Sequence, residues 1–337
     1  MTQRPSVTER ELVTWVRRDF GIDLIGAKPV GGGTDEAART WRATTREGAR
    51  VAVRVSSARA VGVWLASALA LDGIPGVPMP WRTLDGRMWS QSGHQRLSVS
   101  TWVSDRPADP DRMTPEHWRA LGRLLARVHA HPVTDALGPV PRAVTDPTDW
   151  VRRARDLPWT IVRHPRADGV TSALAGRLAG AVDALSAVAD TAERLAGQVP
   201  EREPVLCHGD PHLGNVLLGA DMVWLVDWDD AVLGARERDL ILVVGGVLSS
   251  WAVTPEQTTW FAEGYGPLDV DPDSLWLHAC LRALEDVVGF ADRVLDTEHF
   301  DREERTAAVE ILAGVLSERG IGRLVPEQWA WPAGAAR

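Results

Sequence analysis

The stretch that decides the fold is VLCHGDPHLGNVLL, residues Val205–Leu218. His208, Asp210 and His212 stand at alternate positions in it, and Asn215 follows three residues later. The pattern allows two interpretations, a metal site built on the histidines or a catalytic loop that presents one aspartate as a base. A tight transition-metal site needs three or four His, Cys or carboxylate ligands. The stretch supplies two histidines and the other seven are scattered along the chain, so the metal site is the weaker interpretation.

A second polar motif follows in MVWLVDWDD, residues Met222–Asp230. Its first half is an apolar strand pattern, and carboxylates begin at Asp227 where that pattern ends. Magnesium is a hard ion that needs few protein oxygen ligands when nucleotide phosphates complete its shell, so Asn215 and Asp227 suffice. Asp210 is then left to orient an attacking hydroxyl and to accept its proton. The two motifs together predict a phosphotransfer site.

HGDPHLGN followed by VDWDD resembles the paired motifs of the aminoglycoside phosphotransferase family, which has a protein-kinase-like fold. Further along, ERDLILVVGGV, FAEGYG and RALEDV are most similar to the spectinomycin phosphotransferase branch of that family. The resemblance covers most of the chain. It implies an α+β, bilobal architecture. Residues 1–103 are expected to form a small β-rich nucleotide-binding lobe that includes a linker strand, and residues 104–337 a larger helical lobe with the catalytic loop, metal site and acceptor site.

The resemblance also implies roles for single residues. Asp210 is expected to be the catalytic base, and Asn215 and Asp227 the ligands of Mg²⁺. His208 is expected to support the loop by a hydrogen bond to backbone near Asp227. Asp229 is left open between contact with the metal and contact with the substrate. The implied cofactors are ATP, or another nucleoside triphosphate, and Mg²⁺.

Nucleotide contacts are expected from two further segments. Gly31, Gly32 and Gly33 in VGGGTDEA form a suitable phosphate loop, since glycines let backbone N–H groups approach phosphate oxygens. Thr101 and Val103 lie in the expected linker strand, whose backbone contacts the nucleotide base in this fold. Backbone contacts leave little sequence signature, so ATP and GTP are not distinguished.

The phosphate-binding lysine of kinase-like folds is replaced here by Arg54, in VAVRVSS. Lys28 is the only lysine in the chain and precedes the glycine loop. The expected helix of residues 60–71 has no acidic residue, and Ser67 stands where its glutamate would be. In one interpretation Arg54 binds phosphates through its planar guanidinium, positioned by the phosphates, by Asp227 or by another acid. In the other, the nucleotide site is impaired and the protein binds without turnover.

The acceptor is expected to be a cationic aminocyclitol or aminoglycoside. The candidate substrate residues are Asp230, Glu285, Asp286 and His212. The three acids are candidates because acidic groups near the catalytic base attract a cation. The net charge of −9 disfavours nucleic acid and anionic membranes as partners, since both are bound through basic patches. Antibiotic inactivation, self-resistance and biosynthesis remain open as roles. The alternatives are a kinase of another small alcohol, choline-like or a sugar, and a nucleotide-binding pseudokinase or antibiotic-sequestering protein.

Bulk properties predict a globular protein of the cytoplasm. The 337 residues are 45% hydrophobic and 25% charged. Cys207 and Cys280 fit no CxxC motif and form no disulfide framework, which favours a reducing compartment. The N-terminus has no apolar core of signal-peptide length. The apolar run Leu240–Val253 is too short to span a bilayer and is predicted to be a buried helix.

Local patterns predict most of the secondary structure. Thr8 and Thr114 are expected to begin helices as N-caps, the second with Pro115 at its first position. TWRATT and VAVRVS alternate like the strands of a hairpin, and MPWRTLDGRMWSQ is predicted to be a second hairpin that turns at Asp85 and Gly86. A further strand is expected at LSVSTWV. Residues 147–200 and 255–318 are predicted to be helical, with three helices in the second range.

Overall fold

The computed structural model describes residues 7–30, 38–57, 60–134, 137–200, 202–243, 247–248, 251–318 and 320–322. Its contacts divide the chain into two compact units. Unit 1 comprises Met1–Pro141 with His208–Val232, and unit 2 comprises Arg142–Cys207 with Leu233–Arg337. HGDPHLGN and VDWDD therefore fold with the N-terminal sheet in unit 1. The predicted division into lobes of residues 1–103 and 104–337 stays a prediction about function.

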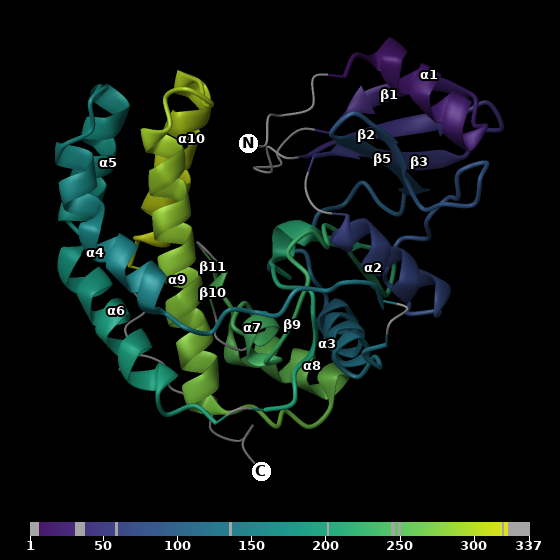
Figure 1. The fold of residues 1–337 in the computed structure, drawn as a ribbon. Helices are drawn as coiled ribbons and strands as arrows, with labels where there is room; N and C mark the ends of the chain where they lie inside the picture. The colour runs from purple at the N-terminus through teal and green to yellow at the C-terminus, as the bar shows by residue number, and fades with distance from the viewer. Residues whose placement is uncertain are drawn as a thin grey trace. The chain divides into compact units, whose positions relative to one another are not determined.

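Unit 1 opens with α1 (Glu9–Phe20) and a five-stranded antiparallel sheet in the order β1-β2-β3-β5-β4 (Figure 1). The Thr8 side chain accepts the Glu11 N–H, and the Glu11 carboxylate accepts the Thr8 N–H, so the predicted cap of α1 is confirmed. The strands are β1 (Leu24–Pro29), β2 (Ala38–Thr45), β3 (Arg50–Ser56), β4 (Ser90–Ser92) and β5 (Gln95–Thr101). The hairpin predicted from TWRATT and VAVRVS is the β2–β3 pair.

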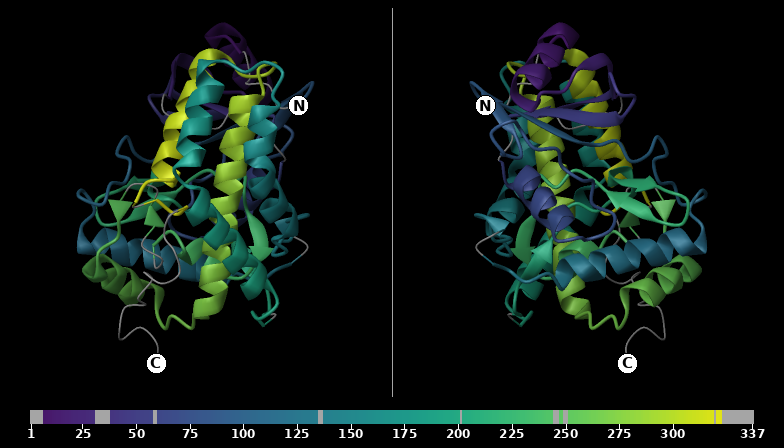
Figure 2. Two further views of the ribbon diagram at one scale, coloured as in Figure 1. Left: turned by 90° about the vertical axis from the view of Figure 1, so that its left-hand side faces the viewer. Right: turned by 90° about the vertical axis from the view of Figure 1, so that its right-hand side faces the viewer.

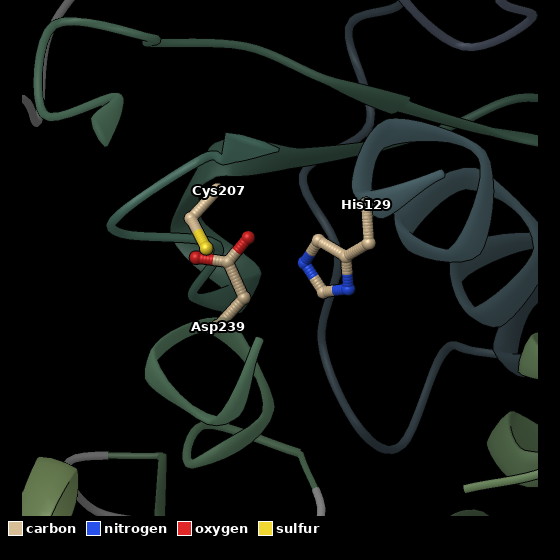
Figure 3. A group of neighbouring side chains, drawn as sticks. All are labelled: His129, Cys207 and Asp239. Carbon is tan, nitrogen blue, oxygen red and sulfur yellow. The ribbon is translucent and has the colours of Figure 1, made fainter. Parts of the chain in front are cut away.

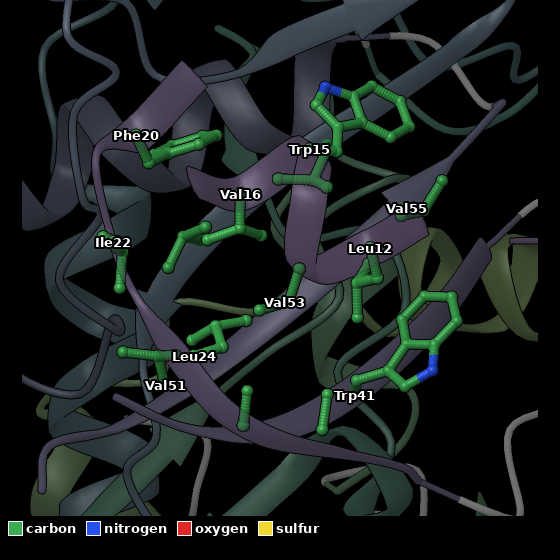
Figure 4. Packing of buried hydrophobic residues seen from close by; sticks show 14 residues of the cluster. Leu12, Trp15, Val16, Phe20, Ile22, Leu24, Trp41, Val51, Val53 and Val55 are labelled. Atoms are coloured by element: carbon green, nitrogen blue, oxygen red, sulfur yellow. The ribbon is translucent and has the colours of Figure 1, made fainter. Parts of the chain in front are cut away.

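One face of this sheet packs on α1 (Figure 4). Val51, Val53 and Val55 alternate along β3 and are fully buried in this core together with Leu12 of α1. Because side chains alternate between the two faces of a strand, Arg54 points to the opposite face from these valines. The hydrophobic register of β3 therefore fixes the side of the sheet on which Arg54 stands.

The second predicted hairpin is wrong in its pairing. The turn at Asp85 and Gly86 forms, and the Gly86 N–H donates to the Thr83 carbonyl oxygen at 2.9 Å. Beyond one bond across the turn, from the Thr83 N–H to the Arg87 carbonyl oxygen, the flanking segments pair with β5 and not with each other. β4 pairs with the first half of β5, and Trp81 donates its N–H to Val99 in the second half. The edge of β5 thus satisfies its backbone groups with two short segments in succession.

The rest of unit 1 carries the two motifs. Its elements are α2 (Val61–Leu71), α3 (Pro115–His129), the single 3₁₀ turn η2 (Leu213–Asn215), β7 (Val216–Leu218) and β8 (Val223–Leu225). The predicted Thr114 cap of α3 is confirmed by a hydrogen bond from the His117 N–H to the Thr114 hydroxyl. β7 and β8 form a hairpin, and the chain after β5 is bonded to it, since the Ala108 N–H donates to Val216 at 2.8 Å.

Unit 2 is mainly helical and is organised around one long helix. α9 packs against α4, α5, α6 and α10, which lie alongside it in the views of Figures 1 and 2. The predicted helical ranges are confirmed, with three helices in the range 255–318. The elements are α4 (Thr148–Val162), α5 (Gly169–Ala179), α6 (Val182–Ala196), β6 (Val205–Cys207), β9 (Val232–Gly234), α7 (Glu237–Leu240), β10 (Val247–Leu248), β11 (Trp251–Ala252), α8 (Pro255–Tyr265), α9 (Pro272–Leu295) and α10 (Arg302–Val315). Together the two units confirm the α+β class.

The prediction of a buried helix over Leu240–Val253 is wrong. α7 ends at Leu240, and the short strands β10 and β11 pair within this stretch. The run contains two consecutive glycines and several valines, residues that disfavour a helix interior and, for valine, favour strands. Among the described helices, none alone is long and apolar enough to cross a membrane; α5 and α6 meet that test only as a pair bent by 67°.

A partly buried ion pair links α5 to α10 within unit 2. Asp168 caps α5 by accepting the Val170 and Thr171 N–H groups. It also accepts two hydrogen bonds from Arg305 of α10, at 2.9 and 3.1 Å. The guanidinium lowers the pKa of Asp168 below its ordinary value of 3.8, followed in effect by the backbone donor of Thr171. Only 6% of the Arg305 side chain is exposed, so a lost partner would leave its charge poorly hydrated.

We expect Asp168→Asn to lower the free energy of unfolding by about 2 kcal/mol at pH 7, since Asn still caps the helix but no longer neutralises Arg305. The pKa of Asp168 is lowered by folding, so its contribution is complete above its unfolded value of 3.8 and is lost as the pH falls through its folded value. Urea unfolding at pH 7 and in acid would measure both effects. Asp190→Asn, in an exposed pair with Arg155, is the control and should change stability by less than about 0.5 kcal/mol.

Candidate active site

The first motif forms a loop that is held by its buried histidine. His208 is fully buried. Its Nε2 lies 3.0 Å from the carbonyl oxygen of Val226, and its Nδ1 accepts the Asp210 N–H at 3.3 Å. The imidazole is therefore neutral with its proton on Nε2, which donates to Val226. Both ring nitrogens are engaged, so His208 acts as a support between the two motifs and offers no nitrogen to a metal.

Gly209 allows the close approach of the two motifs. Its φ of +88° is in the left-handed region, and a Cβ there would lie 2.0 Å from the carbonyl oxygen of Asp230. No other residue type fits this position without displacing the loop. The glycine of HGD is therefore a packing requirement, and it brings the backbone beside Asp210 against the end of VDWDD.

Two hydrogen bonds orient Asn215 and tie it to the strand that precedes Asp227. The Asn215 Nδ2 donates to the carbonyl oxygen of Asp210 at 2.9 Å, so its Oδ1 points away from that carbonyl. The Asn215 carbonyl oxygen accepts the N–H of Val226, also at 2.9 Å. Asp227 follows with a φ of +64°, the one positive φ among the non-glycine residues that the structure describes. Such a backbone is unusual for aspartate and marks a constrained site.

These groups fit magnesium better than a transition metal. An amide oxygen and a carboxylate are the hard oxygen donors that Mg²⁺ prefers, with nucleotide phosphates and water completing its shell. His212 does not add a metal-ligating nitrogen. Its Nδ1 accepts the Gly214 N–H at 2.9 Å, and its Nε2 lies 3.5 Å from the carboxylate of Asp210. His212 thus lies against the predicted base.

Arg54 lies against the acidic end of the second motif. Its Nη2 is 3.0 Å from Asp227 Oδ1 and 2.7 Å from Asp229 Oδ2. The three side chains are 23%, 28% and 23% exposed, respectively. Ser67 of α2 is buried and donates its hydroxyl to the Val63 carbonyl oxygen, so α2 contributes no acid. Asp227 and Asp229, two acids beside Arg54, therefore come from the loop after β8.

Gly62 lets α2 lie directly on that loop. A Cβ at Gly62 would be 2.4 Å from Asp229 Oδ1 and 2.7 Å from the carbonyl carbon of Trp228. Sequence reasoning missed both Gly62 and the Arg54–Asp229 pair. A glycine inside an otherwise apolar helix was the available signal, because such a residue costs helix stability and usually has a packing reason.

Trp228 fixes the loop between the two aspartates. It is buried, donates its Nε1–H to the Leu225 carbonyl oxygen at 3.1 Å, and packs its ring on His208 with centroids 4.5 Å apart. The side chains on either side, Asp227 and Asp229, therefore leave from an anchored backbone. Asp230, next along the chain, is exposed.

The predicted nucleotide contacts are only partly within the described residues. Gly31, Gly32 and Gly33 lie outside them. Thr101 ends β5, and its N–H is used in a hydrogen bond to the Met79 carbonyl oxygen. Val103 is half-buried, and no backbone hydrogen bond joins it to another described residue. The N–H and carbonyl groups of Val103 are therefore more available than the Thr101 N–H for hydrogen bonds to a nucleotide base.

The predicted acceptor acids on α9 both lie beside arginines within unit 2. Glu285 is 3.5 Å from Arg238, and Asp286 accepts a hydrogen bond from Arg282 at 2.8 Å. A cationic ligand that used either carboxylate would share it with a guanidinium. Their predicted contact with substrate stays a prediction.

Cys207, in the same unit, is a structural thiol. It is fully buried and donates to the Ala235 carbonyl oxygen at 3.4 Å. Burial raises the pKa of the Cys207 thiol well above its ordinary value, and the nearby Asp239 carboxylate raises it further (Figure 3). A thiol with a raised pKa carries little thiolate at neutral pH, so Cys207 is a poor nucleophile.

A strand-borne cation, an aspartate on a histidine-held loop and an oxygen donor pair define the class of protein-kinase-like phosphotransferases. The model of the phosphotransferase enzyme family matches residues 27–284. The chain therefore belongs to this family. The family resemblance and the protein-kinase-like fold expected from the sequence are both confirmed.

Solved structures and a curated protein show the same likeness. The chain is similar to spectinomycin phosphotransferase APH(9)-Ia in complex with ADP and spectinomycin, with a TM-score of 0.85, 22% identity, and coverage of 94% of this chain and 97% of that one. It is also similar to amicoumacin kinase hAmiN in complex with AMP-PNP, Ca²⁺ and Ami, with a TM-score of 0.62, 13% identity, and coverage of 94% and 95%. Protein StrN of Streptomyces griseus is 31% identical over 175 residues, 48% of this chain and 52% of that protein. The matched region thus spans about half the length of this curated relative.

We expect Gly62→Ala to destabilise the protein by about 2 kcal/mol, because its methyl group would collide with the backbone and carboxylate of the Asp227–Asp229 loop. Gly176→Ala on α5 is the matched control, since no atom lies within 4 Å of its Cβ position. That control should stabilise the helix, by up to about 1 kcal/mol. Thermal unfolding of both variants would decide, and equal stabilisation by the two would show that α2 does not pack on this loop.

Proposed function

We propose that the protein transfers the γ-phosphoryl group of ATP to a hydroxyl group of a cationic aminocyclitol or aminoglycoside, such as spectinomycin, a related antibiotic or its biosynthetic intermediate. The observation that carries the proposal is the hydrogen-bonded frame that joins Asp210, Asn215 and Asp227 to Arg54. The likeness in fold to a spectinomycin phosphotransferase holding ADP and spectinomycin supports the acceptor class. Antibiotic inactivation, self-resistance and biosynthesis are all compatible with this reaction.

Each group then has one task. The Asn215 Oδ1 and the Asp227 carboxylate hold Mg²⁺, which neutralises phosphate charge when bound. Arg54 binds phosphate oxygens, for which a planar guanidinium is suited. Asp210 orients the acceptor hydroxyl, whose oxygen bonds to the γ-phosphorus as the bond to the β-phosphate oxygen breaks. The hydroxyl proton passes to the Asp210 carboxylate late in the transfer, and ADP leaves.

The remaining predicted residues are assigned by the same proposal. Gly31, Gly32 and Gly33 cover the phosphates, and the backbone of Thr101 and Val103 contacts the nucleotide base. His212, with its Nε2–H toward Asp210, keeps the base in place beside the substrate. Residues 1–103 serve the nucleotide and residues 104–337 carry the catalytic loop and acceptor site. The reducing cytoplasm, which supplies ATP and keeps both cysteines as thiols, is the proposed compartment.

Acidic side chains are proposed to select a cationic acceptor. Asp230, Glu285 and Asp286 carry this role, and the net charge of −9 adds a general attraction for cations. A neutral alcohol such as a sugar would draw no benefit from these groups, whereas a choline-like cation would. The acceptor panel in any assay should therefore include both.

A second candidate function is sequestration of the antibiotic without turnover. It is favoured by one observation, namely that Arg54 replaces the usual lysine while α2 supplies no acid to pair with it. The Asp229 partner of Arg54 weighs against it, because the cation is nonetheless held beside Asp227.

We expect Asp210→Asn to lower the rate of magnesium-dependent ATP consumption by about a hundredfold to ten-thousandfold, because the variant cannot accept the hydroxyl proton. Binding of ADP should be retained. The assay would use spectinomycin, other aminocyclitols, a sugar and choline as acceptors, with the product identified by mass spectrometry. Turnover that survives Asp210→Asn would refute the assigned base, and tight antibiotic binding with no turnover in the wild type would favour sequestration.

We expect Glu285→Gln and Asp286→Asn each to raise KM for a cationic acceptor about fivefold while leaving kcat unchanged, because each removes a partly exposed carboxylate that binds the cation. Steady-state kinetics with varied acceptor at saturating ATP would measure the effect. Glu303→Gln, in the first turn of α10 and outside both motifs, is the control. An unchanged KM in both variants would assign these acids to structural pairs with Arg238 and Arg282.

A further inference from the structure

We propose that Asp229 is the positioning residue for Arg54, and that it holds this arginine while Asp227 is transferred from the guanidinium to the metal ion. The inference rests on the proposed function, because it concerns how the same site accepts Mg²⁺ and nucleotide. In kinase-like folds the phosphate-binding cation is paired with a helix glutamate. Here the task falls to a loop residue two positions after the metal ligand.

The contact geometry shows the sharing directly. One guanidinium nitrogen, Nη2 of Arg54, reaches Asp227 at 3.0 Å and Asp229 at the shorter distance of 2.7 Å. Hydrogen bonds between ions strengthen as they shorten, so the Asp229 contact is the stronger one. Arg54 can give up its bond to Asp227 and keep an acidic partner without moving far.

The packing of α2 explains why the helix cannot supply that partner. The helix has no acidic residue, and Gly62 at its start leaves only enough space for the Asp229 carboxylate and the Trp228 backbone. The position that a helix acid would serve is therefore filled from the loop side. Because Trp228 anchors the loop, the directions of both carboxylates are set before any ligand binds.

The charges give Asp229 its function. A guanidinium and a divalent cation both seek the Asp227 carboxylate, and two cations within a few ångströms repel each other strongly in a site partly shielded from water. Without Asp229, only Asp227 of these two acids would be left. Arg54 and the metal would then compete for the Asp227 carboxylate. With Asp229 present, the arginine stays beside the phosphates while the metal takes Asp227.

The test is a double-mutant cycle read out by ADP binding rather than by turnover. Isothermal titration calorimetry would measure ADP affinity as a function of the Mg²⁺ concentration in the wild type, Asp229→Asn, Arg54→Met and the double variant. We expect Asp229→Asn to raise the half-saturating Mg²⁺ concentration about tenfold, as loss of one charge-assisted hydrogen bond implies. In the Arg54→Met background, the same substitution should change it by less than about twofold.

Each outcome is decisive. An equal effect of Asp229→Asn in both backgrounds would mean that Asp229 binds the metal directly or attracts it only through its negative charge. Either result would overturn the inference. No effect in either background would overturn it as well. Asp221→Asn, an exposed acid on the turn between β7 and β8, removes the same charge and should leave the Mg²⁺ dependence unchanged. If wild-type protein bound no ADP at any Mg²⁺ concentration, the proposed function itself would fail.

Discussion

The backbone of Val226 is the point on which the site depends. Its N–H donates to the Asn215 carbonyl oxygen at 2.9 Å, and its carbonyl oxygen lies 3.0 Å from the Nε2 of the buried His208. The next residue is Asp227. This one residue thus ties the proposed metal ligand to the turn that carries Asn215 and to the loop that carries Asp210. His208 is fully buried and Val226 and Asn215 are half-buried, so leaving either hydrogen bond unmade would be costly.

The same frame explains how an arginine can stand where kinase-like folds place a lysine. A lysine ammonium is a compact charge on a flexible stem, whereas a guanidinium presents several donors in a fixed plane. A planar cation on β3 can be held by acids that approach from the loop below the sheet, and this is where Asp227 and Asp229 lie. The guanidinium is then positioned by the loop that carries Asp227 and Asp229 rather than by a helix. Arg54, the proposed phosphate-binding group, is consequently held by the same loop as the proposed metal ligand.

Candidate site residues are easier to predict from the sequence than the contacts that hold them. Asp210, Asn215 and Asp227 are readable because magnesium and proton transfer require those residue types at those spacings. The partner of Arg54 is not readable, since Asp229 lies 175 residues away and any nearby acid would satisfy the same electrostatic need. The prediction of the second hairpin, whose segments pair with β5 instead, failed for a related reason. Local alternation predicts that a segment is extended, while the choice of partner strand is made by tertiary packing.

Arginine also governs what a cationic acceptor would meet in this protein. Asp227 and Asp229 lie against Arg54, Glu285 against Arg238, and Asp286 against Arg282. Guanidinium groups stay charged throughout the physiological range, so these arginines remain cations beside the carboxylates. A ligand cation must therefore match the geometry of an arginine that is already present, or join a carboxylate that keeps an open side. Under the proposed function, net charge would attract a cationic acceptor, and these arginines would make the choice among acceptors depend on shape.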